Sequence, residues 1–231
     1  MSKKLLIIPA KSNSRRIPGK NFKRFYNKKI IEYSIETAIN SKLFETIHIS
    51  TDRLSKVKKY KNYKNIDISF ARPRSLCKNN TQLVDVLKYV YFEFYKQKKY
   101  FNEIWCLLPC APLINKNDLK KASKFFNKKP NQPVLSVSRF PVPIDWAFML
   151  MKNQKLKPVF KNKHHIPSQN LSQYFYDAGL FSIFPKDFFS KKKFNIFQAF
   201  RGFEIEREKA VDIDNIDDWN LAKKLFKNIK N

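Results

Sequence analysis

The side chains most able to do chemistry lie near the start of the chain. Lys11, Arg15, Arg16 and Lys20, together with the hydroxyl of Ser14, offer five possible phosphate donors within ten positions. They follow directly after the first apolar run of the chain, which is typical of a buried strand. A loop at the carboxyl end of such a strand lies where α/β sheets bind ligands. These residue types therefore indicate a site for a triphosphate.

The common phosphate-binding fingerprints are absent. The chain contains neither GxxxxGK[ST] nor GxGxxG and has only three glycines, which disfavours P-loop ATPases and NAD-dependent enzymes. Because lysine is abundant throughout the chain, a solvated basic turn is an equally good interpretation of the loop taken alone.

Asp212 and Asp214 form a second group of candidate functional residues. Their i, i+2 spacing puts both carboxylates on one side of an extended segment, with Ile213 on the other side. Hard oxygen ligands at this spacing suit Mg²⁺ that bridges nucleotide phosphates. On the residue pattern alone, capping of the helix expected to start at Asn215 is the favoured interpretation.

The elements that must position these residues alternate between strand and helix. This order is typical of an α/β domain whose mainly parallel sheet is covered by helices on both faces. The length of 231 residues fits a single domain spanning 1–231. Segment 139–176 combines proline, aromatic and basic residues without helical spacing, and we expect it to be an extended arm. We expect strands at 5–9, 46–50, 66–70, 103–108, 133–138, 178–184 and 203–205, and helices at 30–41, 54–60, 81–96, 118–127 and 215–229.

The order of residues in the basic loop resembles a family signature. Residues 7–21, IIPAKSNSRRIPGKN, are similar to the IPAR-x-GSKRIP-x-KN motif of the acylneuraminate cytidylyltransferases, or CMP-nonulosonic acid synthetases. The resemblance covers nearly the whole chain in order, through SKLF at 41–44, ISTD at 49–52, RP at 72–73, PCAP at 109–112 and VDID at 211–214. SRFP at 138–141 and YDAG at 176–179 look most like pseudaminic acid cytidylyltransferases.

This resemblance implies a fold and a reaction. The fold would be the Rossmann-like sheet of nucleotide-diphospho-sugar transferases, with 139–176 as a dimerisation and sugar-side insertion of a homodimer. The reaction would transfer CMP from CTP to the anomeric hydroxyl of an acidic nine-carbon sugar, most closely pseudaminic acid, and would release pyrophosphate. A divalent metal, usually Mg²⁺, would be required.

The resemblance also implies roles for individual residues. The catalytic residues would be Lys20, Arg15 and Asp212, and the metal ligands would be Asp212 and Asp214. The sugar would be bound by Arg139, Asp177 and Gly179, for which arm packing and turn formation are the alternative. Arg72 could instead anchor a loop, and Asp52 could be a turn residue. The nucleotide would be bound by Ala10, Lys11, Ser14, Arg15, Lys20, Asn21, Asp52 and Arg72.

Several positions depart from the family pattern. Lys11 replaces the usual arginine, which keeps the charge but loses the bidentate fork, and Asn13 replaces the usual glycine. Lys78 and Asn79 stand where many relatives are acidic, and Leu180 replaces a frequent glutamine. We expect these changes to affect the choice of sugar more than cytidylyl transfer, so sialic, legionaminic and 3-deoxy-octulosonic acids remain alternative substrates.

The formal net charge of +28 has two interpretations. It could mark a non-catalytic protein that binds nucleic acid or another polyanion. Because Ile, Asn, Phe and Tyr are also frequent, an A/T-rich genome is the favoured explanation, and a nucleic-acid partner is not expected. We expect a cytoplasmic protein without a membrane partner, because the apolar run at 5–10 is too short for a signal peptide or span. The three cysteines fit neither a disulfide framework nor a zinc site.

Overall fold

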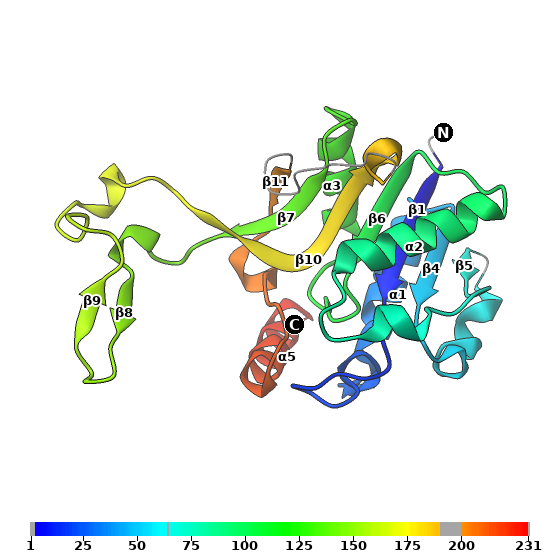
Figure 1. Ribbon diagram of the computed structural model, residues 1–231, viewed down its shortest axis with the longest axis horizontal. Helices are drawn as coiled ribbons and strands as arrows, with labels where there is room; N and C mark the ends of the chain where they lie inside the picture. Colours follow the sequence, from blue (N-terminus) through cyan, green and yellow to red (C-terminus); the bar gives the residue numbers. More distant parts are fainter. Residues whose placement is uncertain (1–2, 64, 190–199, 231) are drawn as a thin grey trace.

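A computed structural model describes residues 3–63, 65–189 and 200–230. Its centre is a seven-stranded sheet in the order β11-β7-β10-β6-β1-β4-β5 (Figure 1). Six of these strands are parallel to one another, and β10 runs antiparallel to its neighbours β6 and β7. The strands are β1 Lys4–Pro9, β4 Thr46–Ser50, β5 Ile66–Asp67, β6 Glu103–Leu107, β7 Val134–Arg139, β10 Phe175–Pro185 and β11 Arg201–Glu204.

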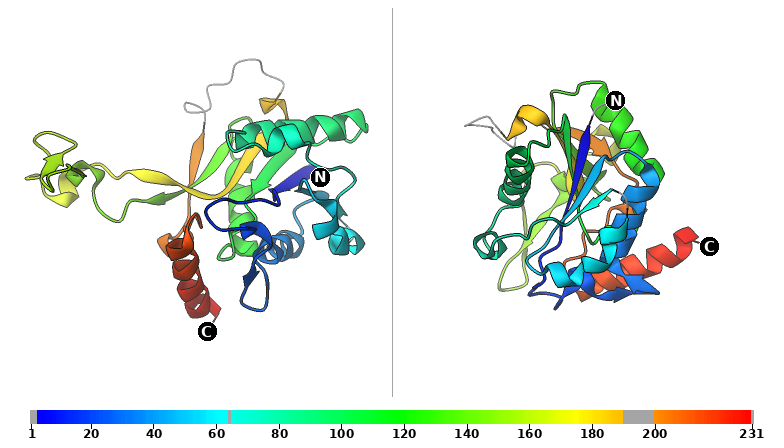
Figure 2. Two further views of the ribbon diagram at one scale, coloured as in Figure 1. Left: turned by 60° about the horizontal axis from the view of Figure 1, so that its bottom comes forward. Right: turned by 90° about the vertical axis from the view of Figure 1, so that its right-hand side faces the viewer.

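Helices cover both faces of this sheet, as the right-hand view of Figure 2 shows. The α-helices are α1 Ile30–Ser41, α2 Leu83–Lys96, α3 Lys116–Asn127 and α5 Ile216–Lys230. Alternate residues of β1 point to opposite faces, as the period of a strand requires. Leu6 and Ile8 pack with α1 and α3, whereas Leu5 and Ile7 pack with α2. The expected α/β architecture is therefore confirmed.

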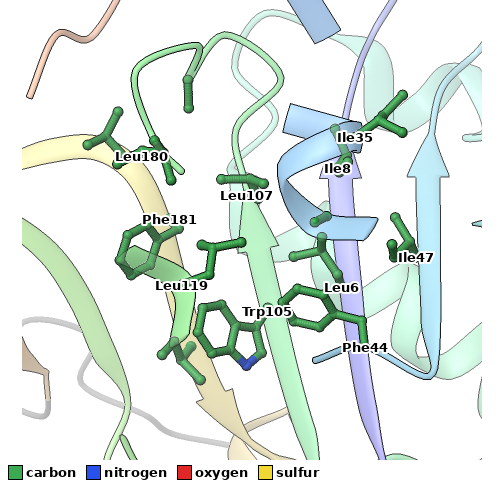
Figure 3. Close-up of a cluster of buried hydrophobic side chains, with 14 of the residues drawn as sticks. Leu6, Ile8, Ile35, Phe44, Ile47, Trp105, Leu107, Leu119, Leu180 and Phe181 are labelled. Atoms are coloured by element: carbon green, nitrogen blue, oxygen red, sulfur yellow. The ribbon is translucent and has the colours of Figure 1, made fainter. Parts of the chain in front are cut away.

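The hydrophobic core on the α1 and α3 side of the sheet is built around Trp105 of β6 (Figure 3). Trp105 is fully buried, and its ring makes an edge contact with Phe44 and stacks on Phe181. Its indole nitrogen donates to the buried carboxylate of Glu103 at 2.5 Å, so the polar edge of the ring is satisfied inside the protein. This packing fixes β6 beside β1, and the carboxyl ends of these two strands lie together.

Several expected elements differ in extent from the structure; β10, for example, begins at Phe175 and not at 178. Three of the differences have a local cause. The helix expected at 54–60 is two short 3₁₀ turns, η2 Leu54–Lys56 and η3 Lys58–Asn62, in a stretch of like charges that disfavours a longer helix. The strand expected at 66–70 ends at Asp67, whose side chain accepts the Ser69 amide at 3.0 Å and forms a turn. Helix α3 begins earlier than expected because Asn115 caps it.

Segment 139–176 projects away from the sheet as a long arm (Figures 1 and 2). Its end is a hairpin of β8 Phe148–Leu150 and β9 Leu156–Pro158, flanked by the 3₁₀ turns η5 Ile144–Trp146 and η6 Ser168–Asn170. More than half of the exposed large hydrophobic side chains of the described residues belong to this segment. None of the described helices is both long and apolar enough to cross a membrane.

Candidate active site

A cavity of about 450 Å³ opens at the carboxyl ends of β1 and β6. The chain continues from β1 to β4 on one side, while β6 lies on the other side. Such a switch point in the strand order is where α/β sheets bind nucleotides. The cavity is lined by Pro9, Lys11, Ser14, Arg15, Arg16, Ile17, Lys20, Asn21, Arg72, Leu76, Lys78, Asn79, Thr81, Leu83, Val86, Leu108, Pro109, Cys110, Gly179, Asp212 and Asp214.

Charges of both signs line this cavity, but cations outnumber carboxylates. The basic side chains are those of Lys11, Arg15, Arg16, Lys20, Arg72 and Lys78, and the acidic ones are those of Asp212 and Asp214. Apolar walls next to fixed charges strengthen electrostatic attraction relative to open water. The cavity is therefore suited to a ligand with several negative charges and to a cation beside the two carboxylates.

The basic loop is shaped by residues at its ends. Ile17 is buried, and its carbonyl accepts the Lys20 amide at 3.1 Å. Asn21 is also buried, and its amide nitrogen donates to the Lys11 carbonyl at 2.9 Å. The Cys110 thiol donates to the side-chain oxygen Oδ1 of Asn21 at 3.4 Å. Asn21 therefore joins the two ends of the loop to the segment that follows β6, in addition to lining the cavity.

Two residues that were predicted to bind the nucleotide support the loop from below. Ala10 is fully buried and its amide donates to the Ser50 carbonyl at 2.8 Å. Asp52 accepts hydrogen bonds from the Ser12 amide at 2.6 Å and from the Ser12 hydroxyl at 2.5 Å. Partial burial raises the pKa of Asp52, but the bonds from Ser12 outweigh it and hold this pKa below its usual value. Neither Ala10 nor Asp52 lines the cavity.

Arg72 is a buried cation on the cavity wall, with 6% of its surface exposed. Its guanidinium donates to the Ser50 carbonyl at 2.8 Å and to the Ser50 hydroxyl at 3.2 Å. No carboxylate of the described residues lies within 4.0 Å of it, and burial lowers its pKa. Because a buried charge requires compensation, this geometry favours phosphate binding over an anchoring role through carboxylates.

The acidic pair lies on the extended segment that precedes α5. Ile213 is fully buried between the two aspartates, so both carboxylates face the cavity as their spacing predicted. Asp214 accepts from Arg16 at 2.7 Å and from Lys20 at 3.3 Å, and Lys20 also donates to the Ile213 carbonyl. Partial desolvation in the cavity, and then the negative charge of Asp214, raise the pKa of Asp212.

The cap of α5 does not use these two carboxylates. The Asn215 side chain accepts from the amides of Asp217 at 2.8 Å and Asp218 at 3.0 Å. The Asp218 carboxylate accepts in return from the amides of Asp214 and Asn215, each at 2.9 Å. Other residues therefore provide the cap, and Asp212 and Asp214 are left to face the cavity.

The chemistry of this pair fits a divalent metal. Mg²⁺ is commonly held by one or two carboxylates plus substrate phosphates, rather than by a complete protein cage. Among the described residues, no group of three or more His, Cys, Asp or Glu side chains is placed to hold a metal ion. Asp212 and Asp214 would be its protein ligands, with the nucleotide completing the set.

The three predicted sugar ligands are not brought together. Gly179 lines the cavity, whereas Asp177 lies outside it and accepts the Gly179 amide at 2.8 Å. Arg139 forms an ion pair with Glu204 at 2.6 Å and lines a separate cavity of about 300 Å³ at the base of the arm. Leu180, expected to affect sugar contacts, is instead buried in the core with 2% exposure.

The sequence predicted only part of the cavity wall that residues 76–86 form. Lys78 and Asn79 were noted only as departures from the family pattern, and Thr81, Leu83 and Val86 had no recognised signal. These residues precede or begin α2, so only the position of that helix beside β1 brings them to the cavity. Pro109 and Cys110 also line the cavity, and both belong to the PCAP segment that resembles the family pattern.

A parallel-type α/β sheet with a cationic loop at its switch point, facing a pair of carboxylates across one cavity, is the arrangement of a nucleotidyltransferase. The sequence model of the cytidylyltransferase family matches residues 5–229. The chain belongs to this family.

Individual relatives agree with this membership. The chain is 31% identical over 226 residues, 97% of both chains, to the pseudaminic acid cytidylyltransferase of Campylobacter jejuni subsp. jejuni serotype O:2. It is 23% identical to the CMP-N,N'-diacetyllegionaminic acid synthase of Legionella pneumophila, over 96% of this chain and 95% of the relative. A solved CMP:2-keto-3-deoxy-manno-octonic acid synthetase complexed with CTP matches the fold with a TM-score of 0.68 at 14% identity, over 99% and 100% of the two chains.

Proposed function

We propose that the protein transfers CMP from CTP to the anomeric hydroxyl of a nonulosonic acid, with pseudaminic acid as the preferred substrate, and releases pyrophosphate. The observation that carries this proposal is that the loop 11–20 faces Asp212 and Asp214 within one cavity. The relatives whose names mention pseudaminic acid support the choice of sugar.

The residues of the cavity would divide the work between binding and charge compensation. Lys11, Ser14 and Arg15 would hold the triphosphate, and Arg72 would contact it from a part of the cavity wall outside the loop. Such transfers are accelerated chiefly by positioning and by charge stabilisation. Lys20 would act near the transferred phosphoryl group, because its ammonium group at the end of the loop already contacts Asp214 at 3.3 Å. When bound at the acidic pair, a divalent metal such as Mg²⁺ supplies Lewis-acid charge at the phosphates.

The proposal is tested by measuring pyrophosphate release with CTP and a panel of nonulosonic acids. We expect turnover with CTP well above that with ATP, GTP or UTP, and highest with pseudaminic acid. Equal use of all four nucleotides would contradict the nucleotide assignment. Higher kcat/KM with sialic, legionaminic or 3-deoxy-octulosonic acid would replace the sugar while retaining cytidylyl transfer.

We also propose that the chain forms a homodimer through the arm 139–176. The arm contributes exposed hydrophobic side chains such as Leu150 and Leu156, and it has little contact with its own core. Exposed apolar surface of this extent is typical of protein interfaces.

A cytoplasmic location is proposed because CTP is supplied there and because Cys77, Cys106 and Cys110 are free thiols.

A polyanion-binding protein is the alternative of a different class, and the net charge of +28 is the observation in its favour. A salt series on the variant with both Asp212→Asn and Asp214→Asn separates the two functions. A polyanion binder would keep a steep loss of affinity with salt in this variant. The proposed enzyme would lose metal-dependent turnover.

A further inference from the structure

The carboxyl end of β4 contributes no side chain to the cavity, yet it holds Arg72 on the cavity wall and also holds the start of the basic loop. Ser50 receives the guanidinium of Arg72 through its hydroxyl and carbonyl oxygens. The Ser50 carbonyl also accepts the Ala10 amide at the start of the basic loop. One residue further on, the Thr51 carbonyl accepts the Arg72 amide at 2.8 Å.

Asp52 extends this set of contacts to the loop itself. Both of its oxygens bind Ser12, one through the amide at 2.6 Å and the other through the hydroxyl at 2.5 Å. Two attachments to one residue fix its orientation as well as its position. Ser12 has 8% of its surface exposed, and the chain then turns toward the cavity, where Ser14 and Arg15 line the wall. The direction of these side chains therefore depends on how Ser12 is held.

We propose that Asp52 is a positioning residue that acts through Ser12 to set the loop for binding the triphosphate of CTP. This inference rests on the proposed function, because it assumes that CTP is the ligand of the loop. Asp52 would not touch the nucleotide. It would instead hold the loop in its binding conformation beforehand, which lowers the conformational entropy that is lost when the nucleotide binds. Asp52 can do this because it directly follows β4, a strand that is anchored in the core.

The protein contains a matched pair of residues that can serve as a control. Asp67, at the end of the neighbouring strand β5, accepts hydrogen bonds from the Ser69 amide at 3.0 Å and from the Ser69 hydroxyl at 2.7 Å. The same two kinds of contact therefore occur one strand away, but neither Asp67 nor Ser69 lines the cavity. A change that affects only general stability should act similarly at both pairs.

The experiment measures CTP affinity by calorimetry with Mg²⁺ and without a sugar, at a temperature well below unfolding. We expect Ser12→Ala to weaken CTP binding several-fold and Asp52→Ala to weaken it at least about tenfold, because hydrogen bonds to charged groups are strong and 1.4 kcal/mol corresponds to tenfold. Asp52→Asn should recover most of this loss, since its amide can still accept from and donate to Ser12. Ser69→Ala should bind CTP like the wild type.

Turnover provides a second measurement. Because the loop holds the triphosphate before and during the reaction, the KM for CTP should rise more than kcat falls. The inference is overturned if Ser12→Ala and Asp52→Ala both bind CTP like the wild type, or if Ser69→Ala weakens binding as much as Ser12→Ala. Should Asp52→Ala not fold, the comparison of Ser12→Ala with Ser69→Ala decides the question. A wild-type protein that does not bind CTP would instead remove the proposed function together with this role.

Discussion

Gly179 lies directly against the carboxylate of Asp212. A Cβ atom added to Gly179 would be 2.8 Å from both Cγ and Oδ2 of Asp212, which is closer than non-bonded carbon and oxygen atoms approach. Gly179 also has a φ of +61°, a conformation that other residues rarely adopt. The glycine of the YDAG segment therefore leaves room for a carboxylate of the acidic pair, which is a different role from the sugar contact expected from sequence.

Gly179→Ala should consequently disturb the acidic pair. We expect kcat to fall at least about tenfold, because displacements near 1 Å in an active site can cost up to a hundredfold. The Mg²⁺ concentration for half-maximal rate should rise as well. Gly19→Ala is a suitable control, since Gly19 has a φ of +63° but a Cβ added there would meet no atom within 4 Å. It should cost stability without changing the Mg²⁺ requirement, and an unchanged requirement in Gly179→Ala would contradict this role.

The sequence predicted the features that depend on local order. A basic loop after a strand places Lys11 and Arg15 at the edge of the sheet, and the i, i+2 spacing turns Asp212 and Asp214 to one side. Both were found as predicted because each follows from the geometry of a single extended segment. The buried Ile213 between the two aspartates provides the reason that this orientation is stable.

Features that depend on distant pairings could not be predicted. The register of β1 on β4, in which Pro9 faces Ser50, brings Ser12 to Asp52, and no local pattern encodes this register. The pairing of β11 with β7 places Glu204 beside Arg139, which gives this predicted sugar ligand an ion-pair partner outside the cavity. Competing partners of this kind are visible only in the folded chain.

The proposed homodimer can be tested at the tip of the arm. Leu150 and Leu156 face each other across the β8–β9 hairpin and are 69% and 60% exposed. Introducing glutamate at both positions should dissociate the dimer, because a charge in an apolar interface loses its hydration. The melting temperature of the monomer should change little. Light scattering at micromolar concentration provides the measurement.

Leu221→Glu on α5 is the control for this change, since Leu221 is 48% exposed on the body of the protein. We expect it to remain dimeric. A monomeric wild-type protein under the same conditions would contradict the proposed assembly.

The raised pKa of Asp212 predicts an effect on stability in the absence of metal. Its pKa in the folded protein is above the usual value because of partial desolvation in the cavity and then the charge of Asp214. An acid with a raised folded pKa destabilises the native state above both pKa values, and this penalty disappears as the pH falls through the folded pKa. Asn cannot ionise, so Asp212→Asn should remove the penalty at neutral pH.

We therefore expect metal-free Asp212→Asn to melt roughly 1–3 °C above the wild type at pH 7, a small effect because solvent screens part of the repulsion. The difference should vanish under acidic conditions where the wild-type carboxylate is protonated. Thermal unfolding in a chelator across a pH series measures both values. A wild-type protein that melts at a higher temperature than Asp212→Asn at pH 7 would show that the charge of Asp212 does not destabilise the metal-free fold.

The same substitution should be costly for the reaction. Asp212→Asn and Asp214→Asn should each lower kcat by at least about a hundredfold, because a metal contributes several kcal/mol of charge stabilisation and 1.36 kcal/mol corresponds to tenfold. CTP affinity should suffer less, since Lys11, Arg15 and Arg72 would still hold the phosphates. A loss mainly in kcat is the mark of an interaction that is stronger in the transition state.

Asp217→Asn provides the matched control for both variants. It removes the same charge within a few residues, but Asp217 is exposed in the first turn of α5 and does not line the cavity. Its kcat should stay close to that of the wild type, which separates the acidic pair from the general negative charge at this helix terminus. Pyrophosphate release over a range of Mg²⁺ concentrations measures all three variants. Near wild-type, Mg²⁺-dependent turnover of Asp212→Asn and Asp214→Asn would show that this pair does not bind the metal.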